Sequence, residues 1–539
     1  MKETQNIPGF KPSLAAEPYV QHLHSLVYSL SERLEAQDKK IAELEAEIRR
    51  LKNLPRKPDI KPSKLDEGTP PTEKPKKKDK KNWTKSKKKA NLEIHEQRPV
   101  KAEQVPPNWQ FAGYKSHLVQ DFIVRANNIE YQLEVWKSPD GKEELTATLP
   151  GHLQNTDFGP ILKGYILHQY NECGVSQALI QSSLKDFGVQ ISGGQINNIL
   201  IEDKEGFHGE KESLLTKGIE LGEELKTDDT GARHQFKNGF CNCINSPLFT
   251  YFTTTYSKSR INFLEILRQG RTDYTINQAA LDYIEKEKLP PKYYNILFQS
   301  HEKGQRVLED KAELAAYCAK HNFKAQYALR TITEALLIGT LTEHGFDPGT
   351  VIHSDGAGQF NLFVHALCWK HAERPLVKLK CYNPVQQNLW DEKMTAYWSL
   401  YQQLKRFKLD PDPALADGLD KQFDGLCEPV INFSSLNRVL EELKAKKQQL
   451  LVVLTRPGTS LHNNDSERDI REYAKRRKLS AGTRSENGRK ARDTFLSLKK
   501  TCRKLGISFW EYLLDRLQGK NEIPPLSLVM EQKSMTAMA

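Results

Sequence analysis

Hydrophobic residues near the amino terminus recur at alternating spacings of four and three positions. One polar residue interrupts the series, and Glu, Lys and Arg fill many positions between its members. The members are Leu23, Val27, Leu30, Leu34, Gln37, Ile41, Leu44, Ile48 and Leu51. Such a seam predicts a coiled coil over residues 23–52, and therefore self-association into a homo-oligomer, most simply a dimer. The alternative is a single amphipathic helix packed on its own domain, which Pro55 and the charged segment behind it disfavour.

The apolar periodicity stops in residues 53–91, where Pro, Lys, Thr and Asp dominate. Ten lysines lie between Lys74 and Lys89, against a single Asp79. A segment of this composition cannot bury a core, so it is predicted to be a disordered basic linker. Two roles remain open for it: a solubilising tether, or sequence-independent attraction to DNA phosphates.

Short runs in which apolar and polar residues alternate follow in residues 92–153. One of them, Ile129–Trp136, stands before a turn signal at Pro139–Gly141. Alternation next to a turn is typical of β-strands, so the pattern predicts a small β module. The segment contains no cysteine, and the module is therefore not a zinc ribbon.

Helical spacing replaces the alternation in residues 155–215. Ser176 and Ser192 stand where helix N-caps are expected, and Gly188 lies in a short turn between the two helices. This arrangement predicts a helix-turn-helix-like DNA-binding region, although any three-helix bundle gives the same pattern. The amide side chains expected to read base edges are Gln195, Asn197 and Asn198.

Strand-like patterns begin after Gly222. The run that starts at Glu224 ends in two acids, Asp228 and Asp229. Two further β-rich runs are Phe236–Ile244, with a turn signal at Asn238–Gly239, and Leu248–Tyr256. Together the runs predict a three-strand meander whose first strand delivers a carboxylate at its end.

A second acid, Asp355, lies where another apolar strand stops. That strand begins near Gly349, and glycines directly after the acid let backbone or ligand approach closely. Sites in α/β sheets form at the carboxyl ends of strands, which is where Asp355 is expected. A helix over Leu367–Arg374 is predicted to follow.

The stretch Leu461–Gly506 joins a cluster of acids to a dense basic run. Asn463 and Asn464 are of the type that caps helix N-termini, and acids in a first turn suit the helix dipole. The acids are Asp465, Glu467 and Asp469, and the cations are Arg471, Lys475, Arg476, Arg477, Lys478, Arg484, Arg489, Lys490 and Arg492. Carboxylates that hold metal beside cations that hold phosphates suit a polyanion-processing site. The alternative is a solvated helix with internal ion pairs, such as Glu467 with Arg471.

Two strand-end aspartates and Glu467 form a set of three carboxylates that can hold two divalent metal ions for in-line phosphoryl transfer. One ion would activate the attacking water or 3′-hydroxyl, and the other would stabilise the leaving oxygen. Mg²⁺ suits the set because it accepts a few carboxylates and keeps positions open for phosphate oxygens. Mn²⁺ is the second candidate ion.

The charge balance favours a nucleic acid partner. The 539 residues carry a net charge of +11 with a pI near 9.0, and this length predicts three or four domains. No apolar run is long enough to cross a bilayer, and Met1–Phe10 lacks a signal-peptide core. The eight cysteines form no CxxC pair, which is typical of reduced thiols. A cytoplasmic, nucleoid-associated protein without a membrane partner is therefore expected.

Three runs resemble those of the insertion sequence 66 transposases, a family of the DDE class. They are TDDTGAR at Thr227–Arg233, HSDGAGQF…ALCWKHAER at His353–Arg374 and HNNDSERDIR…RRK…GTRS at His462–Ser485. The resemblance implies an α/β, ribonuclease H-like catalytic domain over residues 220–485, with helical insertions near 272–343 and 383–451. Such an enzyme binds double-stranded DNA at transposon ends, cleaves it and joins the 3′-hydroxyls to target DNA. Accessory proteins of the same element are candidate partners.

The resemblance also implies roles for individual residues. Asp228, Asp355 and Glu467 match the catalytic residues, which are also the ligands of Mg²⁺. Asp229 is a rival for the first position and Asp465 for the third. Residues expected to contact phosphate or to pack in the core are His371 and Arg374, and those chosen as phosphate contacts are Arg471, Arg477 and Lys478.

The carboxyl-terminal segments are predicted to be helices over residues 486–523 and a disordered tail over 524–539. Two other functions stay open. One is a metal-dependent, structure-specific nuclease on the same fold, which cuts DNA without joining strands. The other is a non-catalytic DNA-binding regulator built on the coiled coil and the helical region.

Overall fold

The computed structural model describes residues 93–538, except for 102–109, 113, 118, 141, 155 and 305. The chain divides into two compact units, residues 1–120 and 121–539. The predicted coiled coil at 23–52 and the basic linker at 53–91 lie outside the described residues. In the described part of the first unit the chain forms neither helix nor strand, and its side chains are exposed.

The second unit begins with two short antiparallel strands. β1 (Val135–Lys137) pairs with β2 (Glu144–Thr146), and all six residues are exposed. A hairpin without a third strand or a helix has nothing on which to bury a face. Of the β module predicted at 92–153, the described residues form only this hairpin and the 3-10 turn η4 (Gly151–Leu153).

Four helices follow, in agreement with the helical pattern of residues 155–215. They are α2 (Pro160–Asn171), α3 (Gln177–Asp186), α4 (Gly193–Ile201) and α5 (Glu205–Leu221). The two predicted serine caps are present: Ser176 accepts from the backbone N–H of Leu179, and Ser192 accepts from that of Gln195. Apolar side chains on one face of each helix lie in the main core of the protein.

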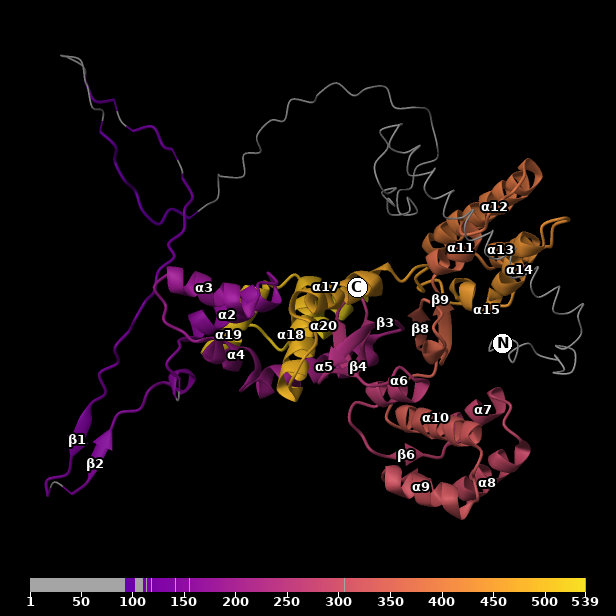
Figure 1. Cartoon of the computed structure of the whole chain (residues 1–539), viewed down its shortest axis with the longest axis horizontal. Helices are drawn as coiled ribbons and strands as arrows, with labels where there is room; N and C mark the ends of the chain where they lie inside the picture. Colours follow the sequence, from indigo (N-terminus) through magenta and orange to yellow (C-terminus); the bar gives the residue numbers. More distant parts are fainter. Residues whose placement is uncertain are drawn as a thin grey trace, which may run out of the picture. The chain divides into compact units, whose positions relative to one another are not determined.

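A five-stranded mixed sheet lies at the centre of the second unit (Figure 1). Its strands are β3 (Glu224–His234), β4 (Lys237–Asn245), β5 (Thr250–Thr255), β8 (Val351–Ser354) and β9 (Val364–Leu367). The spatial order is β5-β4-β3-β8-β9. The first three strands in sequence pair antiparallel, as the meander prediction required, while β8 and β9 run parallel to β3.

The first hairpin turns at a different place from the one predicted. β3 continues past Asp229 to His234, and the turn consists of Gln235 and Phe236, whose φ angles are 48° and 62°. Two positive φ values are what a tight two-residue hairpin turn requires. Gly239 instead lies inside β4, where a Cβ atom would stand 2.7 Å from the carbonyl oxygen of Thr255. This glycine therefore permits close strand packing rather than a turn, and the predicted turn at Asn238–Gly239 is wrong.

Helices cover both faces of the sheet. α17 (Asn464–Ser480) and α18 (Glu486–Lys504) pack on one face, where Cys241, Cys243 and Phe252 meet Ile470, Tyr473 and Leu496. The opposite face turns Leu225, Ile244 and Tyr251 into the main core, together with α5. Because side chains alternate along a strand, each position of β3 is assigned to one face or the other.

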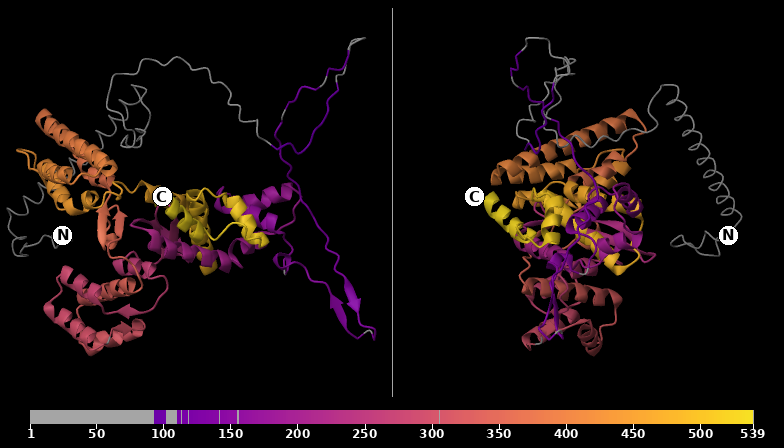
Figure 2. Two further views of the ribbon diagram at one scale, coloured as in Figure 1. Left: turned by 180° about the vertical axis from the view of Figure 1, so that it is seen from behind. Right: turned by 90° about the vertical axis from the view of Figure 1, so that its left-hand side faces the viewer.

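Two groups of helices interrupt the sheet, as the sequence predicts. The first contains α6 (Arg260–Leu267), β6 (Tyr274–Thr275), α7 (Gln278–Lys286), α8 (Pro291–Glu302), β7 (Val307–Leu308), α9 (Lys311–Lys320) and α10 (Gln326–Glu343). The second follows η5 (Gly358–Phe360), β9 and α11 (Trp369–Val377), and contains α12 (Pro384–Leu409), α13 (Pro413–Leu426), α14 (Ser434–Lys444), α15 (Lys447–Leu450) and α16 (Val452–Thr455). Figures 1 and 2 show the two groups on opposite sides of β8 and β9.

Two further helices form the carboxyl-terminal end of the described chain. α19 (Phe509–Gln518) packs on α2, and α20 (Leu526–Met538) packs on α5. Leu526 and Met530 of α20 are both fully buried. The prediction of a disordered tail over 524–539 is therefore wrong, because these apolar side chains complete the main core. No helix in the described part of the chain is both long and apolar enough to span a bilayer.

We expect Met530→Ala to lower the free energy of unfolding by about 2–5 kcal/mol, because it removes a fully buried side chain. Met535 lies on the same helix but is 68% exposed, so Met535→Ala should change stability by less than about 0.5 kcal/mol. Denaturant unfolding of both variants measures the difference. Equal effects would show that α20 does not pack on the core.

Candidate active site

The strand register brings Asp228 and Asp355 together. In the parallel pair of β3 and β8, Lys226 stands opposite His353. Continuing the register by two residues places Asp228 opposite Asp355, directly after the end of β8. Neighbouring strands lie about 4.8 Å apart, so the two carboxylates share one edge of the sheet.

Asp228 and Asp229 project from opposite faces of β3. Asp228 pairs with Cys243, whose side chain packs against α17 and α18, so Asp228 faces the same two helices. Asp229 points to the other face, where its carboxylate accepts a hydrogen bond from the side-chain amide of Gln359. Only Asp228 shares a face with Glu467, which distinguishes the two rivals for the first position.

Three polar contacts fix the start of α17 against the sheet. The buried side chain of Asn463 donates to the carbonyl oxygen of Thr227 at 2.8 Å, and its backbone N–H donates to the sulfur of Cys368. Asn245 donates to Ser466 at 2.9 Å. Asn463 holds the N-cap position but makes no side-chain cap, contrary to expectation, because its amide reaches back to β3 instead. These contacts place the first turn of α17, which contains Glu467, near the sheet edge that holds Asp228 and Asp355.

Asp465, the rival for the third position, is engaged elsewhere. Lys226, whose side chain is buried, donates to the Asp465 carboxylate at 2.7 Å. Although burial opposes ionisation, this hydrogen bond and charge hold the pKa of Asp465 below its ordinary value. The pair ties the first turn of α17 to β3, and Glu467 is the acid of this turn that is not engaged by Lys226.

Burial and neighbouring acids both act on the pKa of Asp228. Burial raises the pKa of the Asp228 carboxyl to about 7, and the nearby charge of Asp355 adds to the rise. Asp229 and Glu467 push the pKa in the same direction, while the hydrogen bond from the Asp229 N–H opposes it. Burial also raises the pKa of Asp229, against the opposing charge of Lys258.

Glu467 lies beside two groups of α11. Its Oε1 atom is 3.6 Å from Nε2 of His371 and 3.7 Å from Nη2 of Arg374. Burial and the charge of Arg374 lower the pKa of His371, so the imidazole is neutral at physiological pH. The motif residues His371 and Arg374 therefore contact the third acid directly, which the sequence alone did not predict.

The donor set suits a hard divalent cation in its chemistry. Asp228 and Asp355 share one sheet edge, and a cation would relieve the repulsion between their charges. Among the described residues, however, no group of three His, Cys, Asp or Glu side chains is already arranged as a metal cage. Glu467 is turned towards α11, so closing a site requires its side chain to rotate towards the aspartates.

The residues predicted to read DNA bases lie on α4. Gln195 and Asn198 are exposed and Asn197 is half-buried. The Gln195 side chain accepts from the Ser192 N–H in a capping box, and Asn197 accepts from Gln177 at 3.4 Å. Asn198 is therefore the residue that best fits the predicted contact with base edges, because its side chain is exposed and is not used in a bond of this kind to another described residue.

The predicted phosphate contacts lie on α17. Arg471 and Lys478 are exposed. Arg477 is half-buried, and its Nη1 atom lies over Gly231 of β3, 3.4 Å from where a Cβ atom would stand. A side chain at that glycine would push the guanidinium aside.

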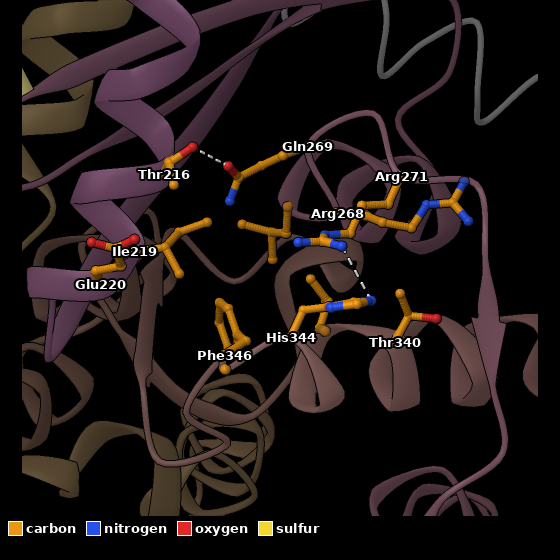
Figure 3. A pocket seen from close by; sticks show the side chains of 12 residues that line it. Thr216, Ile219, Glu220, Arg268, Gln269, Arg271, Thr340, His344 and Phe346 are labelled. Carbon is orange, nitrogen blue, oxygen red and sulfur yellow. Dashed lines mark hydrogen bonds between the residues drawn. The ribbon is translucent and has the colours of Figure 1, made fainter. Parts of the chain in front are cut away.

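A separate cavity lies between α5, the end of α6 and the end of α10 (Figure 3). In Figure 3, Thr216 is hydrogen-bonded to Gln269, and His344 lies beside Arg271 at 3.3 Å. None of the three candidate carboxylates lines this cavity. It is therefore distinct from the candidate active site.

A family model identifies the class of protein to which this fold and site belong. The model of the transposase IS66 family matches residues 309–491, which include Asp355 and Glu467 but begin after Asp228. The chain belongs to the transposase IS66 family. A relative from Sinorhizobium fredii (strain NBRC 101917 / NGR234), named "Uncharacterized protein y4jO", is 40% identical over 324 residues, which are 60% of this chain and 100% of the relative. No solved structure matches the chain.

The raised pKa of Asp228 predicts a stability that depends on pH. The folded state holds this proton up to about pH 7, while the unfolded chain releases it near 3.8, so ionised Asp228 destabilises the folded protein as pH rises between these values. We expect Asp228→Asn to raise the unfolding free energy, relative to the parent, by about 2 kcal/mol more at pH 8 than at pH 5. Denaturant unfolding without divalent cations measures this.

Asp465→Asn is the matched control for this experiment. It breaks an ion pair with Lys226 that is already formed at both pH values, so it should destabilise the protein by a similar amount at pH 5 and pH 8. A gain for Asp228→Asn that does not widen with pH would contradict the raised pKa.

Proposed function

We propose that this protein is a DDE transposase that binds transposon ends, cleaves DNA and joins 3′-hydroxyls to target DNA by in-line phosphoryl transfer. The observation that carries the proposal is that Asp228 and Asp355 share one sheet edge, while Glu467 lies in the first turn of a helix that is bonded to the strand of Asp228. The three acids are remote from one another in sequence. Membership of the transposase IS66 family agrees with this reading.

The sheet topology supports a ribonuclease H-like catalytic domain. Three antiparallel strands are followed by two strands parallel to the first, and the first acid lies on the central strand. In this arrangement the second acid follows the neighbouring parallel strand, and a later helix brings the third. The helical groups at 272–343 and 383–451 interrupt the domain between these parts.

We further propose that Asp228, Asp355 and Glu467 hold two Mg²⁺ ions, with Mn²⁺ as a substitute. When bound, the ions supply Lewis acidity to the phosphate and activate the attacking oxygen. The chain itself provides three carboxylates as oxygen ligands, and the sheet edge orients those of Asp228 and Asp355. Loss of the Asp228 proton is a condition of binding, since its pKa lies near 7 in the free protein.

Residues of α11 assist Glu467. Neutral His371 and cationic Arg374 keep the glutamate near the sheet edge while it is not engaged by an ion. Arg374 is 56% exposed, so its guanidinium is accessible to a phosphate once Glu467 turns to the aspartates. In this proposal, the movement of Glu467 towards the aspartates also frees the Arg374 guanidinium to bind the substrate.

The proposed DNA interface combines the basic side of α17 with α4. Arg471, Arg477 and Lys478 would contact phosphates, and Asn198, with Gln195 and Asn197, would meet base edges. A homo-oligomer through the predicted coiled coil would hold two transposon ends, with accessory proteins of the element as further partners. The proposed place of action is the nucleoid in the cytoplasm.

Catalysis is tested with transposon-end duplexes, target DNA and Mg²⁺. We expect Asp355→Asn to reduce cleavage and joining by more than about 100-fold, because a metal ligand is lost, while DNA affinity stays within about twofold. Removing Mg²⁺ with a chelator should have the same effect on the parent. Glu442→Gln on α14, an exposed carboxylate paired with Arg438, is the control and should retain full activity.

The products separate the competing functions. Cleavage without joining would indicate a structure-specific nuclease instead of a transposase. Unchanged activity in Asp355→Asn would show that Asp355 is not a catalytic residue. If the parent binds DNA but does not cleave it, a non-catalytic regulator is favoured.

DNA affinity should fall steeply with salt, because phosphate contacts release counterions. Each of Arg471→Ala, Arg477→Ala and Lys478→Ala should reduce the slope of log affinity against log salt concentration by about 0.9. Fluorescence anisotropy with labelled duplex at several salt concentrations measures the slopes. A flat response in the parent would remove the phosphate contacts from the proposal.

A further inference from the structure

Arg476 is a buried cation whose hydrogen-bonding groups are unused. The residue lies on α17 and is 5% exposed. Its Nε, Nη1 and Nη2 atoms are all buried, and none has a hydrogen-bond partner among the described residues. Buried polar groups are almost always paired, so a guanidinium with no acceptor at any of its three nitrogens requires an explanation.

The contact that Arg476 does make leaves its donors available. Its Cζ atom lies 3.3 Å from the centroid of the Tyr170 ring, at the end of α2. Stacking uses the face of the guanidinium, whereas the N–H groups point outward in its plane. Tyr170 therefore fixes the plane of the cation and favours its charged form, but no hydrogen bond of good geometry joins the two side chains.

Two carboxylates on the helices of this seam between α2 and α17 form ion pairs with other cations. Glu172, at the end of α2, is paired with Arg503, and Glu472, one turn before Arg476, accepts from Lys475 at 3.1 Å and from Lys499 at 3.4 Å. These acids are thus neutralised by other cations. Arg476 receives no share of either carboxylate.

A second buried arginine adds positive charge to the same place. Arg492 of α18 is 7% exposed, and its charge disfavours the charged form of Arg476, adding to the burial that lowers the Arg476 pKa. Arg492 donates to the Ala481 carbonyl and to the Ser480 hydroxyl, both at 3.0 Å. The end of α17 is thereby held in position around the seam.

We propose that the seam between α2 and α17 is a binding site for a phosphate-type oxyanion, which Arg476 receives through two parallel N–H donors while Tyr170 holds the guanidinium plane. A planar fork of this kind matches two oxygens of a phosphate group. The group comes from a DNA backbone or from free inorganic phosphate, which share this chemistry. The inference rests on the proposed function only where DNA is the source.

One side chain covers the way into the site. Leu479 lies one turn after Arg476, is 60% exposed, and places its Cδ1 atom 3.2 Å from the Cβ position of Gly174 in the turn after α2. Rotation of Leu479 away from this turn opens the seam at its outer end. An anion would reach Arg476 by this route.

The first arm of the test uses inorganic phosphate and the full-length protein. Thermal unfolding midpoints are measured against phosphate concentration, with chloride at equal ionic strength as the reference and no divalent cation present. We expect a saturable rise of a few degrees for the parent and none for Arg476→Met. Without phosphate, Arg476→Met should unfold at the same temperature as the parent or higher, because it removes a buried charge without an acceptor.

Two further variants make the result specific. Arg438→Met removes an arginine of α14 that is 81% exposed, and it should keep the full phosphate response. Arg476→Lys keeps the charge but not the planar fork, so it should lose most of the response. If Arg476→Met does not fold, the phosphate response of Arg476→Lys tests the site in its place.

The second arm measures duplex affinity at several salt concentrations. If DNA is the source, Arg476→Met should reduce the slope of log affinity against log salt by about 0.9, as one phosphate contact fewer requires. An unchanged slope beside a lost phosphate response would assign the site to free phosphate. If the parent does not bind DNA, the proposed function is refuted. The thermal unfolding measurements with phosphate would still test whether Arg476 binds an oxyanion.

Two results would overturn the inference. A phosphate response of equal size in the parent and Arg476→Met would mean an adventitious ion only. A lower midpoint for Arg476→Met, with no phosphate response in the parent, would make Arg476 a stacking residue of the core.

Discussion

A single buried amide joins the parts of the candidate active site. Asn463 bonds through its side chain to the carbonyl of Thr227, the residue before Asp228, and through its backbone to Cys368 at the end of β9. Four residues later on the same helix stands Glu467. This junction ties β3, the end of β9 and the start of α17 to one another. A buried carbonyl deprived of its donor would cost about 1–3 kcal/mol.

Once the junction is formed, the repulsion among the acids follows from it. Asp228 is held in a place where burial and a neighbouring carboxylate oppose its ionisation, so the folded protein carries an unfavourable interaction at neutral pH. Favourable interactions nearby offset it: Lys226 with Asp465, and Asn245 with Ser466, hold the same first turn of α17. Such a local conflict is typical of functional sites, where the scaffold forces groups together that would separate if free.

Much of this arrangement follows from local sequence patterns. The meander, the helical groups and the identity of the three acids are signalled by alternation, helical spacing and short motifs. The hairpin turn at Gln235–Phe236 is not, because neither residue is a typical turn former and the glycine nearby serves strand packing. The sequence predicts a disordered tail because nothing local shows that Leu526 and Met530 are buried. Their burial depends on α20 packing against the distant helix α5.

The finer chemistry of the site depends on contacts between distant segments, which no local pattern encodes. Nothing near residue 463 predicts that its amide bonds to residue 227, and nothing in the basic run marks Arg476 as buried while Arg471 and Lys478 are exposed. In a sequence these three cations look equivalent. Their surroundings differ because Arg476 lies against Tyr170 of α2 and near Arg492 of α18.

The distribution of charge in the folded chain argues for a ligand that carries both signs. Acids of the scaffold have internal partners: Asp469 is paired with Lys500 and Lys504 at 3.1 and 3.0 Å. At the sheet edge, by contrast, burial and the charge of Asp355 both oppose the ionisation of Asp228, and in the seam beside α17 the buried guanidinium of Arg476 stacks on an aromatic ring. In the part of the chain that the structure describes, no cation is hydrogen-bonded to Asp228 and no carboxylate to Arg476. The substrate proposed above would offset both, because divalent cations would neutralise the carboxylates and phosphates would accept from the arginine.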